Sequence, residues 1–314
     1  MLFPISGVEV FPLWPPLVAL VVSFFTSMAG VSGAFLLLPF QVSVLHFTSP
    51  AVSPTNLVFN IVAIPSGVYR YIREGRMTWP LCWLTILGTL PGVFLGALAR
   101  IVYLPDPKAF KFFVGLVLAY IGLRLIFDSV RQKAENKASN KSSAEEIARR
   151  LSALRQAGGR ESAVKTIEFS FRRVSYQFLG QIFQASAPAI FLMALGVGLV
   201  GGAYGIGGGA IIAPFFVSVF GLPVHTVAGA ALMGTFVTSI AGVAFYSLIA
   251  PHFAHLGLAV APDWLLGALF GLGGLVGMYF GARAQKHLPA RAIKLILAGL
   301  LIFVSGGYIW QFFA

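Results

Sequence analysis

Long apolar stretches alternate with short polar connections along the whole chain, and only one long polar stretch interrupts this pattern. An apolar run of about 18 or more residues is long enough to cross the hydrocarbon core of a bilayer as a helix. We read five apolar segments before the polar stretch and five after it. They lie at residues 11–29, 31–47, 54–72, 79–101, 107–127, 185–203, 206–221, 225–250, 263–284 and 290–311. The second segment of each half is short for a full crossing.

The two halves of the chain repeat each other. Residues 30–39, "GVSGAFLLLP", align with residues 205–214, "GIGGGAIIAP", and the same offset of 175 carries Asn60 onto Thr235. Five spans per half is an odd number, so the halves must enter the membrane with opposite orientations. The sequence therefore predicts an all-α integral membrane protein, an inverted repeat of 5+5 mostly transmembrane segments with short, broken or re-entrant-like second segments.

The polar stretch divides the chain into three parts. We expect a first transmembrane repeat at 1–128, a cytoplasmic insert at 129–184 and a second transmembrane repeat at 185–314. Within the insert, "SAEE" has the spacing of a capping box and predicts a helix over about 143–158. The alternation in "IEFSFR" and the glycine in "YQFLGQIF" predict strands and a hairpin. The insert is either a charged linker that sets topology or a regulatory module.

Composition and charge agree with a membrane protein. The chain is 58% hydrophobic and 10% charged, with a mean hydropathy of +0.86, whereas a soluble domain is about 25% charged. Twelve of its 22 Lys and Arg lie between Arg124 and Arg173, as in a cytoplasmic loop. The net charge of +12 therefore indicates a lipid bilayer and no nucleic-acid partner. Both termini then fall outside, together with Arg100, Lys108 and Lys111.

The scarcity of acidic residues and cysteines in the predicted spans limits the chemistry that is possible inside the membrane. None of the ten Asp and Glu residues falls near the middle of a predicted span. Proton relays and intramembrane metal sites usually need buried acids, and the single cysteine, Cys82, excludes a disulfide or a multi-cysteine metal site. We therefore expect no catalytic residue, no metal site, no cofactor and no enzymatic activity, and a pathway that suits an anionic substrate.

The glycine-rich run "YGIGGG" before "AIIAPFF" is the candidate binding site. Glycine adopts positive φ and lets a ligand approach the backbone, and the first N–H groups of a helix attract anions. Transporters built from inverted repeats bind substrate between such broken helices near the membrane midplane. The candidate substrate-binding residues are Gly30, Ser32, Gly33, Asn56, Asn60, Gly205, Gly207, Gly208, Gly209 and Thr235.

Two plainer interpretations compete with binding at these positions. Glycines on one helix face allow close helix packing, which is the interpretation we prefer for Gly267, Gly271, Gly274, Gly277 and Gly281. Hydroxyl groups within a span, including those of Thr55, Thr238 and Ser239, often bond to their own helix backbone.

At these motifs the sequence resembles the TauE/SafE sulfite exporter family, also called TSUP, the 4-toluene sulfonate uptake permease family. The resemblance rests on "GVSGAFLLLPF" with "AVSPTNLVFNIVAIPSGVYRYIREGRM" in the first half. In the second half it rests on "GGAYGIGGGAIIAPFFVSVFGLPVHTVAGAALMGTFVTSIAGVAFY" and "APDWLLGALFGLGGLVGMYFGARA". The first motif departs from the family at Ser32 and Ala34, where glycine is favoured.

The resemblance implies a multi-pass permease of a prokaryotic inner (plasma) membrane that moves sulfite or organosulfonates, commonly outward. Our hypothesis is an exporter that works by alternating access and holds a small sulfur-containing anion at the glycine-rich helix N-termini. Two alternatives remain open. One is an uptake permease for a related anion, and the other is a membrane scaffold or sensor that signals through the insert. The oligomeric state is left open.

Overall fold

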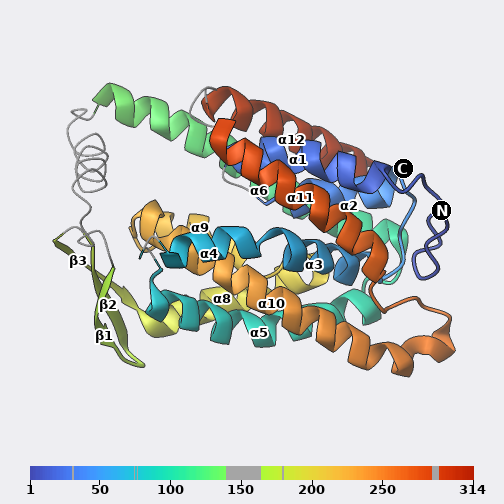
Figure 1. Cartoon of the computed structure of the whole chain (residues 1–314), viewed down its shortest axis with the longest axis horizontal. Helices are drawn as coiled ribbons and strands as arrows, with labels where there is room; N and C mark the ends of the chain where they lie inside the picture. Colours follow the sequence, from blue (N-terminus) through green and yellow to red (C-terminus); the bar gives the residue numbers. More distant parts are fainter. Residues whose placement is uncertain (30–31, 74, 76, 139–163, 179, 285–289) are drawn as a thin grey trace.

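The computed structural model describes residues 1–29, 32–73, 75, 77–138, 164–178, 180–284 and 290–314. The first half contains helices α1 (Trp14–Ala29), α2 (Ala34–Ser43), α3 (Val52–Ala63), α4 (Pro65–Arg73), α5 (Trp79–Val102) and α6 (Pro107–Ala138). The second half contains α8 (Ala187–Tyr204), α9 (Gly209–Ser218), α10 (Val224–Phe253), a short 3-10 turn η2 (Ala254–Leu256), α11 (Trp264–Ala284) and α12 (Ala290–Phe313). Figure 1 shows both termini at one end of the bundle, which we call the terminal end.

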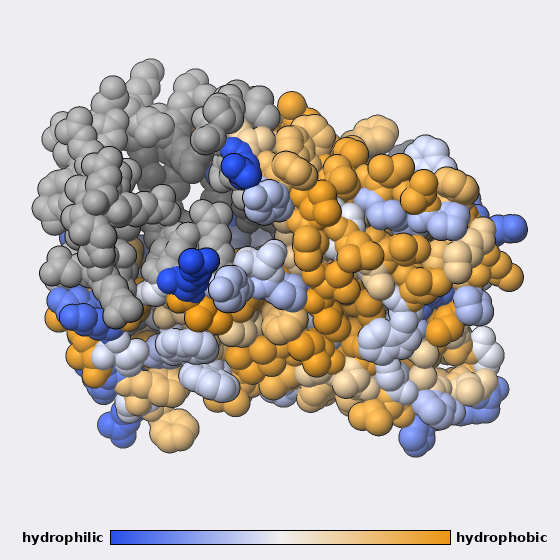
Figure 2. Space-filling model, viewed as in Figure 1, coloured by the Kyte–Doolittle hydropathy of each residue, from blue (hydrophilic) through white to orange (hydrophobic). Residues whose placement is uncertain are grey.

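Among the described residues, six helices are long and apolar enough to cross a membrane: α5, α6, α8, α10, α11 and α12. Large apolar side chains such as Leu192 and Phe303 are exposed on these helices. Figure 2 shows hydrophobic residues spread over the middle of the visible face, with hydrophilic residues gathered toward its two ends. Soluble proteins rarely expose so large an apolar surface. The chain is therefore a multi-pass, all-α integral membrane protein, as the hydropathy pattern predicts.

The two short helices α2 and α9 do not cross a bilayer. Each has 10 residues, which at 1.5 Å per residue gives about 15 Å, half of a ~30 Å hydrocarbon core. Both contain a proline, Pro39 and Pro214. The second segment of each half is thus a half-length helix whose N-terminus lies inside the protein.

The third predicted segment, 54–72, is wrong as a single helix. The structure breaks it into α3 and α4, and Pro65 begins the second helix. Proline has no N–H and its ring clashes with the preceding turn, so a straight helix through this position is disfavoured. Its counterpart in the second half, α10, has Ile240 at the equivalent position and continues for 30 residues.

Helix packing follows the repeat. The repeat makes α1 the counterpart of α8, α2 of α9, α3 of α10, α5 of α11 and α6 of α12. When each helix is exchanged for its counterpart, the contacting pair α1–α11 becomes α8–α5, α11–α3 becomes α5–α10, and α2–α3 becomes α9–α10. All of these pairs are in contact in the structure. The α6–α12 and α3–α10 pairs each map onto themselves. This exchange symmetry is what an inverted repeat requires, because the two halves then meet about a common axis.

Hydrogen bonds to the two prolines repeat in the same way. The guanidinium of Arg124 on α6 donates to the carbonyl of Pro214 at 2.9 Å. The hydroxyl of Tyr308 on α12 donates to the carbonyl of Pro39 at 3.3 Å. The sequence offset of 184 that aligns glycines in these two helices also aligns Arg124 with Tyr308. Each half-length helix is therefore held by the same position of the last helix in the other half.

The glycines assigned to packing do pack. A Cβ on any of them would come within 3 Å of atoms of α3 or α1, so these helix pairs approach closely because the glycines have no side chain. The α3 side is faced by Gly267, Gly271 and Gly274, and the α1 side by Gly277 and Gly281.

A small antiparallel sheet lies at the end of the bundle opposite the termini (Figure 1). Its strands are β1 (Lys165–Phe169), β2 (Arg173–Phe178) and β3 (Gln181–Ser186), in that spatial order, and Tyr176 pairs with Phe183. Gly180, between β2 and β3, has a φ of +81°. Tyr176 hydrogen-bonds Thr226 at the start of α10 at 2.8 Å. The helix expected over 143–158 lies outside the described residues.

Candidate functional site

The two candidate turns connect the first two helices of each half. The first turn lies between α1 and α2, where the structure describes Ser32 and Gly33, and the second turn is residues 205–208, between α8 and α9. The second turn is entirely buried. Gly205 and Gly207 have φ values of +87° and +75°, in the left-handed region that favours glycine. This backbone ends α8 and redirects the chain into α9, as the glycine run predicts.

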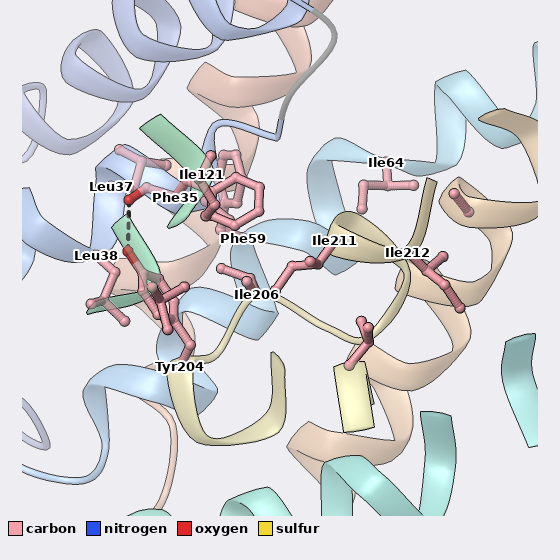
Figure 3. Packing of buried hydrophobic residues seen from close by; sticks show 14 of the residues in the cluster. Phe35, Leu37, Leu38, Phe59, Ile64, Ile121, Tyr204, Ile206, Ile211 and Ile212 are labelled. Carbon is pink, nitrogen blue, oxygen red and sulfur yellow. Dashed lines mark hydrogen bonds between the residues drawn. The ribbon is translucent and has the colours of Figure 1, made fainter. Parts of the chain in front are cut away.

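The first and second turns lie next to each other in the interior. The side-chain amide of Asn56 donates to the carbonyl of Ala34 at 3.1 Å and to that of Gly205 at 3.0 Å. The hydroxyl of Tyr204 donates to the carbonyl of Phe35 at 2.9 Å, the dashed line in Figure 3. Elements from the two halves of the repeat thus meet at the N-termini of α2 and α9.

Hydroxyl groups surround the second turn. The N–H of Gly208 donates to the hydroxyl of Thr238 at 3.3 Å. A Cβ on Gly207 would lie 3.0 Å from the hydroxyl oxygen of Ser239. On the other side, a Cβ on Gly208 would lie 2.5 Å from the Cβ of Thr89. The turn is therefore enclosed by polar side chains of α5 and α10 as well as by apolar ones.

Two of the nearby hydroxyls have no hydrogen-bond partner. The hydroxyl oxygens of Ser239 and Thr85 are fully buried and unpartnered. Thr85 lies against Gly234, whose Cβ would be 2.6 Å from its methyl group and 3.9 Å from the Cα of Gly209. A buried polar group without a partner costs free energy, so each one needs an explanation, of which a ligand is one.

The predicted donors Asn60 and Thr235 are occupied in this structure. The amide of Asn60 donates to the carbonyl of Ile206 at 2.9 Å, and its side-chain oxygen has no partner. The hydroxyl of Thr235 donates to Ala231 on its own helix at 2.9 Å. That is the backbone bonding that we weighed against binding for span hydroxyls. Asn60 positions the second turn by holding one of its carbonyls.

The first turn satisfies more of its own groups. The N–H of Ala34 donates to the hydroxyl of Ser32 at 3.2 Å. Gly33 is buried against Ser23 and Phe59, and the hydroxyl of Ser23 is buried without a partner. Gly30 lies outside the described residues.

Buried acids do not approach the second turn in the described part of the chain. Asp263 is only 2% exposed, but its carboxylate accepts hydrogen bonds from the N–H of Leu266 and the hydroxyl of Ser6. It thereby caps the start of α11. Asp106 accepts the N–H of Ala109 in the first turn of α6. The electrostatic field at the start of α9 is therefore set by helix N–H groups and neutral dipoles, which favour an anion.

The burial of one basic residue was not predicted. The charge count assigns Arg100 to the outer side of the membrane, and the structure buries its side chain completely in the last turn of α5. Its guanidinium carbon lies 3.6 Å from the ring centroid of Phe110 on α6, the next helix. Hydropathy places an arginine at the edge of an apolar segment outside the membrane core, whereas packing by the following helix covers it. The available signal was an arginine inside the predicted segment 79–101.

Comparisons with known proteins identify relatives over most of the chain. The family model for the sulfite exporter TauE/SafE matches residues 16–308. The chain is 22% identical over 292 residues to the probable membrane transporter protein YunE of Bacillus subtilis, covering 91% of this chain and 92% of that protein.

A second relative matches a shorter part. The probable membrane transporter protein YdhB of the same organism is 29% identical over 112 residues, which cover 36% of this chain and 42% of that protein. No solved structure matches the chain. The family match spans both repeats and both turns, and the fold is that of a multi-pass membrane protein. The chain therefore belongs to the sulfite exporter TauE/SafE family of membrane transporters.

Proposed function

We propose that the transported substrate is a small sulfur-containing anion, such as sulfite or an organosulfonate, and that it binds at the second turn. The observation that carries the proposal is the buried N-terminus of α9, which neutral hydroxyls surround and no described carboxylate approaches. The first N–H groups of a helix have no intrahelical acceptor, and the helix dipole adds a partial positive charge there. A sulfite-like oxyanion has the charge and the acceptor oxygens that this position lacks.

The groups at the second turn have separate roles in this proposal. The N–H of Gly208 exchanges the hydroxyl of Thr238 for an anion oxygen, and the N–H groups of Gly207 and Gly209 supply further donors. The unpartnered hydroxyl of Ser239 donates to a second oxygen. Thr235, whose methyl group faces Gly207, closes the site from the side of α10.

The first turn and the two asparagines complete the site. The side-chain amides of Asn56 and Asn60 donate to backbone carbonyls of the second turn in this structure. When an anion enters between the turns, these amide N–H groups leave the carbonyls and donate to the anion. Ser32, Gly33 and, by repeat position, Gly30 present the N-terminus of α2 from the opposite half. The same contacts that close the turns on each other then separate as the substrate enters, as alternating access requires.

We infer that transport runs outward across the inner membrane of a prokaryote, with both termini outside and the insert in the cytoplasm. A membrane potential that is negative inside drives an anion outward by about 2.3 kcal/mol per charge per 100 mV. A carrier without a buried carboxylate at its site can use this potential directly. Single-cysteine labelling tests the orientation, because the one native cysteine, Cys82, is buried. Reporters at Gly257 and Gly180 lie at opposite ends of the bundle.

Substrate transport is tested with the full-length protein in proteoliposomes loaded with sulfite. The proposal predicts sulfite efflux that an imposed potential accelerates and that requires neither Na⁺ nor a pH gradient. Sulfate, thiosulfate and sulfoacetate as competitors rank the anions. The variant Ser239→Ala should slow efflux, whereas Ser247→Ala, on the same helix but bonded to its own backbone, should not. Strict Na⁺ dependence, or no flux of any sulfur anion, would overturn the proposal.

A further inference from the structure

The guanidinium of Arg100 has hydrogen-bonding capacity that the described protein does not use. It donates to the carbonyl of Thr48 at 3.0 Å and to the carbonyl of Leu104. Its Nε is buried and has no partner, and no described carboxylate pairs with the side chain. The side chain is fully buried, so the charge is removed from water. A buried arginine usually has an anionic partner, and Arg100 has only neutral oxygens and an aromatic ring.

A purely structural role does not account for the charge. Arg100 lies in the last turn of α5, where a donor to the free carbonyls and a positive charge are both favourable. The dipole interaction at a helix end is weaker than the cost of burying an unpaired ion. A neutral donor such as glutamine could also donate hydrogen bonds to these backbone carbonyls. The retained charge therefore indicates a charged ligand in another state of the transporter.

The position of Arg100 connects it to the second turn. Tyr246 on α10 is fully buried in one cluster with Ile101, the neighbour of Arg100, and its hydroxyl donates to the carbonyl of Gly202 at 3.2 Å, just before that turn. Ser53 donates to the carbonyl of Ala203 at 2.8 Å, and its own carbonyl lies against Gly205. These contacts connect the end of α5 that carries Arg100 to the second turn.

Both carbonyls bound by Arg100 belong to connections at the terminal end. Thr48 lies between α2 and α3, and Leu104 lies between α5 and α6. In Figure 1 both connections lie on the side of the two termini, opposite the sheet. Arg100 therefore holds together two connections at this end of the protein.

We propose that Arg100 is a second binding site for the transported oxyanion, on the route between the second turn and the terminal end. The guanidinium exchanges the carbonyls of Thr48 and Leu104 for two oxygens of the anion, a pairing that its planar fork favours. Release of the carbonyls frees the two connections, so arrival of the anion and opening of this end are one event. The chemical identity of the anion rests on the proposed function, whereas the site rests on Arg100 itself.

Equilibrium binding to the purified full-length protein tests the proposal, with radiolabelled sulfite and chloride as separate probes. The wild type should bind two sulfite ions. The variant Arg100→Gln should bind one, and Arg100→Lys should bind the second at least about tenfold more weakly, because a lysine lacks the planar fork. The control Arg283→Gln removes a charge that is exposed and bonded to Tyr279, and it should bind two. Two sulfite ions of unchanged affinity in Arg100→Gln would overturn the proposal.

A measurement on the wild type does not depend on whether a variant folds. Phenylglyoxal modifies arginines that it can reach, so Arg100, which is buried in this structure, should react only while the terminal end is open. Mass spectrometry follows the reaction at each site. Sulfite should protect Arg100 and leave Arg283 unchanged, whereas no reaction at Arg100, or equal reaction with and without sulfite, would overturn the proposal.

The two proposals fail differently. If Ser239→Ala weakens sulfite binding while Arg100→Gln does not, the central site stands and the Arg100 site falls. If the wild type binds chloride but no sulfite, and Arg100→Gln abolishes chloride binding, the Arg100 site stands and the sulfur assignment falls.

Discussion

In the first turn the N–H of Ala34 is satisfied by the hydroxyl of Ser32, two residues away, whereas in the second turn the N–H of Gly208 depends on Thr238 on another helix. The two turns hold equivalent places in the repeat and both begin a half-length helix. They differ in where the partner of the helix N-terminus comes from. An anion that binds the second turn displaces only a tertiary contact, whereas one that binds the first must break a hydrogen bond within the turn itself. The second turn is therefore the better site.

The surroundings of the equivalent glycines differ in the same direction. A Cβ on Gly33 would meet the hydroxyl of Ser23 at 2.6 Å, the end of a side chain that can rotate. A Cβ on Gly208 would meet the Cβ of Thr89 at 2.5 Å, which is fixed by the backbone of α5. The first turn has room to adjust, and the second does not. Variants of the two turns should therefore have unequal effects.

The largest effect is expected for Gly205→Ala. The left-handed φ of this residue costs about 1–2 kcal/mol for an alanine, and the new Cβ would overlap the carbonyl of Ser53. We expect most of the folded protein to be lost, measured as the yield and melting temperature of the purified protein. The control Gly299→Ala places a Cβ in open space on α12 and should melt like the wild type. Recovery of Gly205→Ala at wild-type stability would contradict the geometry of the second turn.

A matched pair of variants compares the turns directly. Gly208→Ala pushes against Thr89, so we expect a lower melting temperature and sulfite binding at least about tenfold weaker. Gly33→Ala needs only a rotation of Ser23, and Ser23→Ala in the same chain should remove the remaining strain. Thermal unfolding with and without sulfite gives the melting temperature of each variant and its relative affinity for sulfite. Equal losses in the two variants would remove the distinction between the turns.

Removal of one hydroxyl should weaken binding without unfolding the protein. Ser239→Ala removes a hydroxyl that has no partner within the protein and that donates to the bound anion in our proposal. A hydrogen bond to a charged group contributes about 1.5–3 kcal/mol, which corresponds to roughly tenfold or more in affinity. We expect the sulfite KM for efflux to rise by about that factor, with Ser247→Ala as the control. An unchanged KM would place the anion elsewhere.

The hydrogen bond within the first turn should matter mainly for stability. Ser32→Ala removes the acceptor for the N–H of Ala34, and loss of such a hydrogen bond costs about 0.5–1.5 kcal/mol. Because this hydroxyl is already engaged, sulfite affinity should fall by less than in Ser239→Ala. Chemical denaturation and sulfite titration of the same preparation separate the two effects. A larger loss of affinity than in Ser239→Ala would reverse the assignment of the two turns.

The smallest effect concerns the contact between the sheet and the bundle. Burial raises the pKa of Tyr176 to about 12, against the opposing hydrogen bond to Thr226. The folded state thus keeps this proton to higher pH than the unfolded state. Tyr176 therefore contributes its full stability below pH ~10 and loses it as the pH rises toward 12.

The variant Tyr176→Phe tests this contact. It should be about 0.5–1.5 kcal/mol less stable than the wild type at pH 7. The difference should shrink above pH ~10, because only the wild type has the raised pKa. Melting temperatures of both proteins across this range supply the measurement, and a difference that does not change with pH would contradict the assignment.

The sequence predicted the features that depend on local pattern. Span lengths, the half-length second segments, the repeat and the glycine turn all follow from hydropathy and from residue type, and the strand alternation before Gly180 follows in the same way. The break at Pro65 was visible as a proline, but a hydropathy window averages over one residue and joined α3 to α4.

Features that depend on distant contacts were missed. Burial of Arg100 requires Phe110 from the next helix and carbonyls from two connections, so no local pattern reports it. Asn60 looked free in the sequence, yet it bonds Ile206, which lies 146 positions later. Thr89 lies against Gly208 and Thr85 lies against Gly234 only because α5 packs with one particular face toward α8 and α10. Helix phase of this kind is set by tertiary packing.

The central claim is that the anion binds at the second turn. Its most direct test is equilibrium binding of radiolabelled sulfite to the purified full-length protein, for the wild type, Ser239→Ala and Ser247→Ala. We predict saturable binding that is about tenfold weaker in Ser239→Ala and unchanged in Ser247→Ala, with all three proteins melting alike. Equal sulfite affinity in the three proteins would contradict the claim.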